Sequence, residues 1–137
     1  MDDQANLPDD ASAAIHFENL TFTYKRTDRP ALEDVNLRIE TGRFVGLIGR
    51  NGAGKSTLAR CVNGIVPKFA KGKLAGRVSV LGRDVSTASV AEMTPSVGIV
   101  FQDFETQIFS TGLTREIAFV MENLGRSREE MRAAVDH

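Results

Sequence analysis

The chain of 137 residues is 42% apolar and 26% charged with a formal net charge of −1, as expected of a globular protein with enough length for one core. This balance excludes the basic excess that attracts nucleic acid or an anionic membrane, and no apolar run approaches the ~18 residues of a membrane-spanning helix. Residues 1–10 hold four Asp and no Lys or Arg. We therefore expect residues 1–13 to form a disordered acidic tail rather than a targeting signal.

Strand candidates follow the tail. Residues 14–24 combine β-branched and aromatic side chains, and residues 35–39 alternate apolar and polar side chains before a turn at Thr41-Gly42. The alternation predicts an antiparallel layer. Three further short segments have strand character, namely residues 44–48, 77–81 and 97–101. The last of them is apolar enough to lie in a sheet that is covered on both faces.

Residues 49–57, with the sequence G-R-N-G-A-G-K-S-T, fit the phosphate-binding (Walker A) pattern G-x-x-x-x-G-K-[ST]. We call these residues the phosphate loop. Their glycines allow turn conformations that a Cβ would obstruct, so that consecutive N–H groups converge at the start of the following helix. That helix is expected to run through Val62 and to end at Gly64. The pattern predicts that the chain binds a nucleoside triphosphate.

The residue types of the loop suggest separate roles. Lys55 is expected to reach the β- and γ-phosphates, and the Ser56 hydroxyl to ligate a Mg²⁺ ion that bridges the same oxygens. Thr57 is a further candidate phosphate donor. The rest of the loop would cradle the nucleotide, through Gly49, Arg50, Asn51, Gly52, Ala53 and Gly54. No G-x-G-x-x-G register can be drawn through these glycines, which argues against a dinucleotide-binding dehydrogenase.

Three other residues have side chains that could serve in a site. Tyr24, at the end of a predicted strand upstream of the loop, could stack on the purine base, or it could pack in the core or at an edge. His16 has no Cys or His cluster near it in the sequence, and we assign it no role. The single cysteine, Cys61, can form no internal disulfide, which agrees with a reducing cytoplasm, and we expect a small buried side chain.

The order of these motifs closely resembles the N-terminal half of an ABC transporter ATPase. The matching segments are Tyr24, residues 31–37, the phosphate loop, residues 76–84 and residues 100–103, and the resemblance covers nearly everything from Ile15 onward. It implies an α/β fold for residues 14–137. This would be a P-loop NTPase core of the ABC type with an antiparallel β layer and, from about residue 103, the start of a helical subdomain. The resemblance also implies that Tyr24 stacks on adenine and that Gln102 forms the Q-loop, which touches the Mg²⁺ and the attacking water.

A finer resemblance lies in residues 101–110, 116–119 and 122–125, which look like the energy-coupling-factor group of ATPases that drive uptake of vitamins and of cobalt or nickel. Two positions depart from that group, which usually has proline where Phe104 stands and a helix-capping threonine where Gly112 stands. The resemblance implies that this region meets a membrane subunit. Phe104, Gln107 and Phe109 are the candidate contacts.

Three family motifs are absent from the sequence: the signature loop, the apolar strand that ends in Asp-Glu (Walker B) and the switch histidine. The sequence therefore predicts roughly the first half of an ATPase domain, which stops inside a helix that begins with a capping box at Ser127 and Glu130. We expect the isolated chain to bind ATP and Mg²⁺ with hydrolysis near background. An apolar sheet edge is expected to be exposed and to cause poor solubility or self-association.

The resemblance also implies partners. In the full-length family form two ATPase subunits enclose two Mg-ATP at the cytoplasmic face of the membrane, and their closure moves transmembrane subunits. A transmembrane subunit and a second ATPase subunit are thus predicted, and no nucleic acid. Two alternatives stay open: a nucleotide-binding regulatory module without turnover, and a soluble ABC-type ATPase of translation or DNA repair. The transported solute cannot be inferred, since the family leaves its recognition to a separate membrane subunit.

Overall fold

The computed structural model describes residues 13–136, apart from the side chains of Phe104 and Thr106. The chain divides into two compact units between Gly98 and Ile99, and each is described by itself. Most of the expected acidic tail lies outside the described residues. Its last expected residue, Ala13, instead begins the first strand and is buried.

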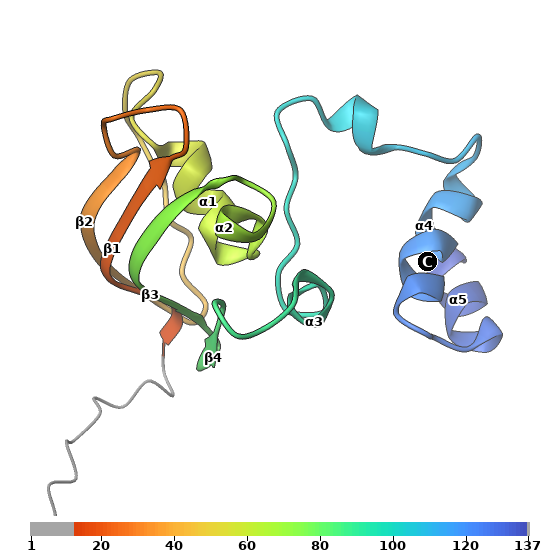
Figure 1. Cartoon of the computed structure of the whole chain (residues 1–137). Coiled ribbons are helices and arrows are strands. Elements are labelled where there is room, and N and C mark those ends of the chain that lie inside the picture. The colour runs from red at the N-terminus through yellow and green to blue at the C-terminus, as the bar shows by residue number, and fades with distance from the viewer. Residues whose placement is uncertain (1–12, 137) are drawn as a thin grey trace, which may run out of the picture. The chain divides into compact units, whose positions relative to one another are not determined.

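The first unit is built on a sheet of four antiparallel strands (Figure 1). The strands are β1 (Ala13–Tyr24), β2 (Leu32–Glu40), β3 (Gly72–Val80) and β4 (Arg83–Asp84) in the order β2-β1-β3-β4. The helices α1 (Lys55–Val62) and α2 (Ile65–Lys68) lie over one face of this sheet, and α3 (Val90–Met93) follows β4. The predicted antiparallel layer is confirmed.

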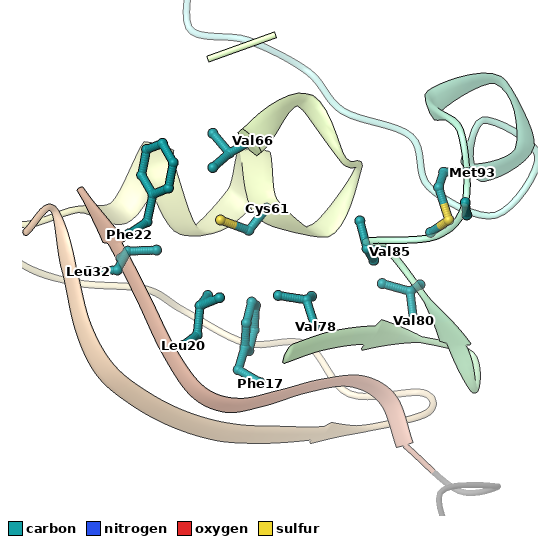
Figure 2. Packing of buried hydrophobic residues seen from close by; sticks show 11 residues of the cluster. Phe17, Leu20, Phe22, Leu32, Cys61, Val66, Val78, Val80, Val85 and Met93 are labelled. Carbon is teal, nitrogen blue, oxygen red and sulfur yellow. The ribbon is translucent and has the colours of Figure 1, made fainter. Parts of the chain in front are cut away.

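The core lies between the sheet and α1 (Figure 2). Phe17, Leu20 and Phe22 of β1 point toward the helices and are at most 2% exposed. Burying each of these side chains contributes about 1.5–3 kcal/mol. Cys61 of α1 faces them, and burial raises the pKa of its thiol to about 12, so the side chain stays neutral. The expectation of a small buried side chain at Cys61 is confirmed.

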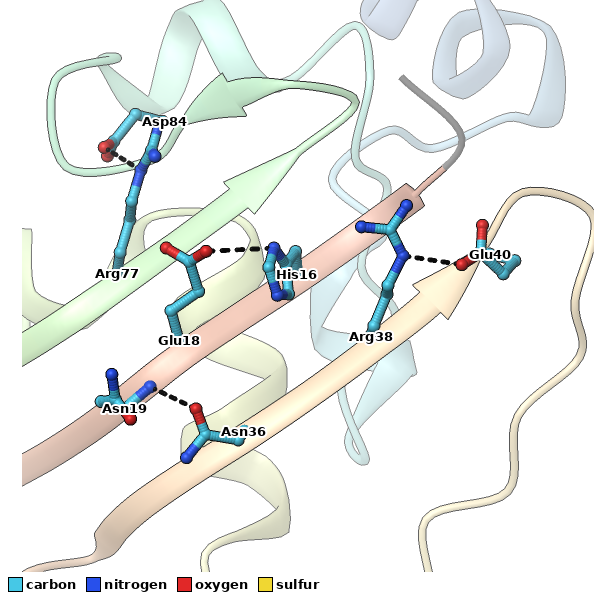
Figure 3. A network of polar contacts seen from close by, with 8 residues as sticks. All are labelled: His16, Glu18, Asn19, Asn36, Arg38, Glu40, Arg77 and Asp84. Carbon is cyan, nitrogen blue, oxygen red and sulfur yellow. Dashed lines mark hydrogen bonds and ion pairs between the residues drawn. The ribbon is translucent and has the colours of Figure 1, made fainter. Parts of the chain in front are cut away.

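The opposite face of the sheet carries polar side chains (Figure 3). His16 Nδ1 lies 3.5 Å from a Glu18 carboxylate oxygen, and the Arg38 guanidinium donates to Glu40 at 2.7 Å. The alternation of these residues with the apolar side chains follows from the two-residue period of a strand. Such partly exposed polar contacts stabilise a fold little, so the face is best described as a solvated surface. His16 belongs to this polar face.

The carboxyl of Asp84 makes the stability of this sheet fall at acid pH. Burial alone would raise the pKa of its carboxyl, but hydrogen bonds from Ser86 and from the Arg77 guanidinium outweigh burial and hold that pKa below its usual value. A carboxyl with a lowered pKa contributes stability above its unfolded pKa of about 3.9 and loses that contribution as the pH falls through the folded pKa. We therefore expect D84N to flatten the fall of the unfolding midpoint below about pH 4. Thermal unfolding at a series of pH values checks this, and an unchanged profile would contradict it.

Two predicted strands, residues 44–48 and 97–101, were wrong. Neither segment is in a ladder, because no segment among residues 13–136 pairs with it. In the first segment Phe44 and Ile48 are 102% and 96% exposed. Strand propensity alone forms no strand where the hydrogen-bonding neighbour is lacking. The exposed apolar side chains observed here thus belong to an unpaired segment rather than to a sheet edge, and self-association stays a prediction.

The second unit holds a 3₁₀ turn, η1 (Phe104–Gln107), and two helices, α4 (Leu113–Asn123) and α5 (Arg128–Val135). The predicted capping box at Ser127 and Glu130 is confirmed at the start of α5. α4 begins after Gly112 without a side-chain cap. Large apolar side chains of this helix are exposed, as shown by Leu113 and Val120. Among residues 13–136 no helix has the length and apolar character needed to cross a bilayer.

Candidate functional site

The phosphate loop forms an irregular turn that leads into α1. Gly52 and Gly54 have φ values of +81° and +90°, in the left-handed region that glycine occupies without strain. Gly54 has a second constraint, because a Cβ there would lie 2.4 Å from the Ala31 carbonyl oxygen. The loop is thus fixed against the start of β2 by a backbone contact that only glycine allows. α1 ends as predicted, with Gly64 at a φ of +77° just after Asn63.

Lys55 is the first residue of α1, and its side chain turns back across the loop. The Lys55 ammonium donates to the carbonyl oxygens of Gly49 and Arg50, at 2.6 and 2.8 Å. The Ala53 N–H donates to the same Arg50 carbonyl, which closes the turn. A full positive charge therefore lies over the loop, beside the N-terminal amides of α1, and this arrangement favours an anion.

The next two residues of α1 face different surroundings. Ser56 is exposed, whereas Thr57 is 7% exposed. The Thr57 hydroxyl lies 3.1 Å from the Tyr24 hydroxyl. The Tyr24 ring in turn packs edge-on against Phe22, with ring centroids 4.8 Å apart and planes at 81°. The structure thus brings together Tyr24 and the first turn of α1, two site candidates that are distant in the sequence.

Open hollows lie beside Tyr24 at the end of β1. One has a volume of about 600 Å³ and is lined by Thr23, Tyr24, Lys25, Thr27, Asp28, Gly72 and Lys73. A second, of about 540 Å³, is lined by Tyr24, Lys25, Arg26 and Lys71. Cationic side chains therefore outnumber the single carboxylate of these linings, which favours an anionic ligand at this end of the sheet.

Two of these cationic residues are not indicated as site residues by the sequence. Lys71 and Lys73 stand in a segment whose basic character is typical of a solvated loop. The pairing of Tyr24 with Gly72 across β1 and β3, together with the hydrogen bond from the Lys25 N–H to the Lys71 carbonyl, carries them to Tyr24. Neither motif spacing nor composition indicates that pairing, and only the register of β1 against β3 could have revealed it.

The remaining predicted site residues belong to the second unit. Gln102 is exposed there, and its share in a Mg²⁺ site with Ser56 stays a prediction. The Gln107 side chain accepts from the Phe101 N–H at 3.0 Å, so it shapes its own loop. Phe109 is 76% exposed, and its ring centroid lies 6.1 Å from that of Phe119. The side chain of Phe104 lies outside the described residues.

Comparisons with known proteins agree on one family. Residues 32–137 match the family model described as "ABC transporter". The chain is 50% identical over 118 residues to a proposed ABC transporter ATP-binding protein of Caldanaerobacter subterraneus, and 45% identical over 129 residues to one of Methanosarcina mazei. These matches cover 85% and 94% of the chain but only 21% and 22% of the relatives. The chain therefore spans about a fifth of the length of these curated relatives.

Two solved structures are also similar. CbiO1 from Clostridium perfringens, described as part of the ABC transporter complex cbiONQ, superposes with a TM-score of 0.74 at 28% identity over 89% of this chain and 47% of its own. A bacterial Atm1-family ABC exporter with ATP bound gives a TM-score of 0.57 at 29% identity, over 74% of this chain and 17% of its own. The superpositions place the sheet and the helices of this chain within the ABC ATPase fold.

Proposed function

The chain belongs to the ABC transporter family, and we propose that it supplies the phosphate-binding half-site of an ATP-binding subunit that drives uptake through a membrane importer. The observation that carries this proposal is the phosphate loop. Lys55 lies across the loop at the N-terminus of α1, and Tyr24 is hydrogen-bonded to the same turn of that helix. A cation, the N-terminus of a helix and an aromatic ring are three elements that suit the phosphates and the base of a nucleoside triphosphate.

Each residue of this site has a proposed role. Lys55 would exchange its two carbonyl contacts for oxygens of the β- and γ-phosphates, and Ser56, exposed beside it, would hold Mg²⁺ through its hydroxyl. Mg²⁺ bridges phosphate oxygens and neutralises their charge when it is bound. The backbone of residues 49–54 would surround the phosphates, and Tyr24 would stack on the adenine. Gln102 would contact the ion and the attacking water in the complete subunit.

We propose an importer of the energy-coupling-factor type rather than an exporter. The run from Phe101 to Ser110 supports this type, as does the higher TM-score with CbiO1 than with the Atm1-family exporter. In this proposal the second unit meets a transmembrane subunit through Phe104, Gln107 and Phe109. A second ATPase subunit completes the site at the cytoplasmic face of the membrane. The imported solute is a vitamin or a metal ion.

Titration calorimetry of the 137-residue chain with Mg-ATP tests the nucleotide site. Saturable binding with one site per chain is the expected result, and its absence would contradict the proposed half-site. Affinity purification of the natural protein from its membranes tests the transport role. Recovery of a polytopic membrane protein is expected, whereas ribosomes or DNA would favour a soluble ATPase. Binding without turnover in the natural protein would favour a regulatory module.

Replacing Tyr24 by alanine is expected to weaken Mg-ATP binding by about 1–3 kcal/mol, the usual range for loss of stacking on a base. Y24F retains the aromatic face and is expected to lose less than Y24A. Calorimetric affinities of the two variants give the comparison. Equal affinities of Y24A and the unmodified chain would show that the base binds elsewhere.

A further inference from the structure

The contact between Tyr24 and Thr57 joins two segments that are 33 residues apart in the sequence. Tyr24 is the last residue of β1, and Thr57 is the third residue of α1, which begins at Lys55 after the N-cap Gly54. Their hydroxyl oxygens are 3.1 Å apart. The bond therefore joins the first turn of α1, at the end of the phosphate loop, to the end of β1.

Both ends of this bond are held in place. Thr57 is 7% exposed, and its β-branched side chain has few rotamers within a helix. The Tyr24 ring is constrained by its edge-on contact with Phe22, which is itself fully buried. A hydrogen bond between two constrained groups transmits position well, because neither side chain can move without breaking it. A second fixed point of the same turn is the close approach of Gly54 to Ala31.

The Tyr24 hydroxyl takes part in this contact, whereas stacking on a base would use only the face of the ring. The contact also engages the Thr57 hydroxyl, which the sequence alone suggested as a phosphate donor. We propose that Tyr24 is a positioning residue for the phosphate loop. Its hydroxyl holds the first turn of α1 through Thr57, so that the loop binds polyphosphate better even when no base is present. The inference rests on the proposed nucleotide site and concerns how that site is held in shape.

The test compares Mg-ATP with Mg-tripolyphosphate, which has the phosphates but no base. Y24F keeps the ring and removes one hydroxyl, and T57V removes the other while keeping the shape of the side chain. We expect each variant to bind both ligands about 3- to 10-fold more weakly, as loss of one hydrogen bond predicts. The double variant Y24F/T57V should be no weaker than either single variant, because all three lack the same bond. T57S retains a hydroxyl and should restore the coupling to Tyr24.

A control removes a threonine hydroxyl elsewhere. Thr94 donates to the Val90 carbonyl at 3.0 Å, away from the loop, and T94V should leave both affinities unchanged. Hydrogen exchange of the free chain gives a readout that needs no ligand. The amides whose helical hydrogen bonds begin in the first turn of α1, starting with the Leu58 N–H that donates to the Gly54 carbonyl, should exchange faster in Y24F and in T57V, to the same extent, and not in T94V.

Three results would overturn the inference. They are additive losses in the double variant, a loss in Y24F that affects ATP but not tripolyphosphate, or unchanged exchange in α1. The proposed nucleotide site would still stand after any of these results if the unmodified chain binds ATP saturably and this binding requires Lys55. Failure of the unmodified chain to bind either ligand would instead overturn the nucleotide site and this inference together.

Discussion

Replacing Lys55 by alanine is expected to weaken Mg-ATP binding by about 2–5 kcal/mol, roughly 30- to 5000-fold. The variant removes the positive charge that lies over the phosphate loop and leaves a bound triphosphate without the contact of this ammonium. It also removes the two hydrogen bonds that the ammonium donates to Gly49 and Arg50. Calorimetry with Mg-ATP measures the loss. It should exceed the loss in Y24A, because a charge on the phosphates contributes more than a stacked base.

The matched control for this variant is Lys68→Ala. Lys68 also donates its ammonium proton to a backbone carbonyl, that of Val85 at 2.9 Å, but it lies in α2, outside the phosphate loop. K68A therefore removes the same charge and a similar bond, and it should change the melting temperature without a comparable change in affinity. Equal losses of affinity in K55A and K68A would mean that net charge, rather than a defined phosphate site, attracts the nucleotide.

Replacing Gly54 by alanine is expected to have the largest effect of a single methyl group in the site. The added Cβ would lie 2.4 Å from the Ala31 carbonyl oxygen and 3.0 Å from Leu32 Cδ2, at a φ of +90°. The loop must move away from β2 to accommodate it. We expect the free energy of unfolding to fall by at least about 2 kcal/mol and nucleotide binding to be lost. Thermal unfolding and calorimetry measure the two effects.

Gly52→Ala separates the effect of a positive φ from the effect of the close contact that Gly54 makes with Ala31. Gly52 has a similar φ of +81°, but a Cβ there would meet nothing within 4 Å. The variant should cost only about 1 kcal/mol of conformational strain and should keep a measurable affinity. If G52A and G54A were equally affected, the contact of Gly54 with Ala31 would have no part in fixing the loop.

The features that local chemistry determines could be predicted from the sequence. The helix that ends at Gly64 and the capping box at Ser127 each depend on a few neighbouring residues, and both are observed. The phosphate loop is likewise a local pattern, and its binding role stays a prediction. The antiparallel layer could also be predicted, because alternation of side chains indicates one buried and one solvated face. The match to one family model over residues 32–137 indicates that these local patterns follow one another in the order found in a single fold.

Features that depend on distant partners could not be predicted. Residues 44–48 have the composition of a buried strand, but a strand needs a neighbour in a ladder, and propensity contains no information on that neighbour. The contact of Tyr24 with Thr57 and the approach of Lys73 to Tyr24 depend on register and on the packing of α1, which are set by the whole core. The short helix α3 was missed although Ser89 and Glu92 form a capping box, since its four residues are too few to show a period.

Because Cys61 is buried, its reaction with a thiol reagent reports local opening of the fold around α1. A thiol that is 1% exposed and has a pKa of about 12 reacts with alkylating reagents only when α1 separates from the sheet. The labelling rate therefore measures how often the helix behind the phosphate loop opens, without any engineered probe. A ligand that binds the loop should slow labelling. If a second cysteine were placed on the polar face of the sheet, the reagent would label that cysteine, and not Cys61, while the chain is folded.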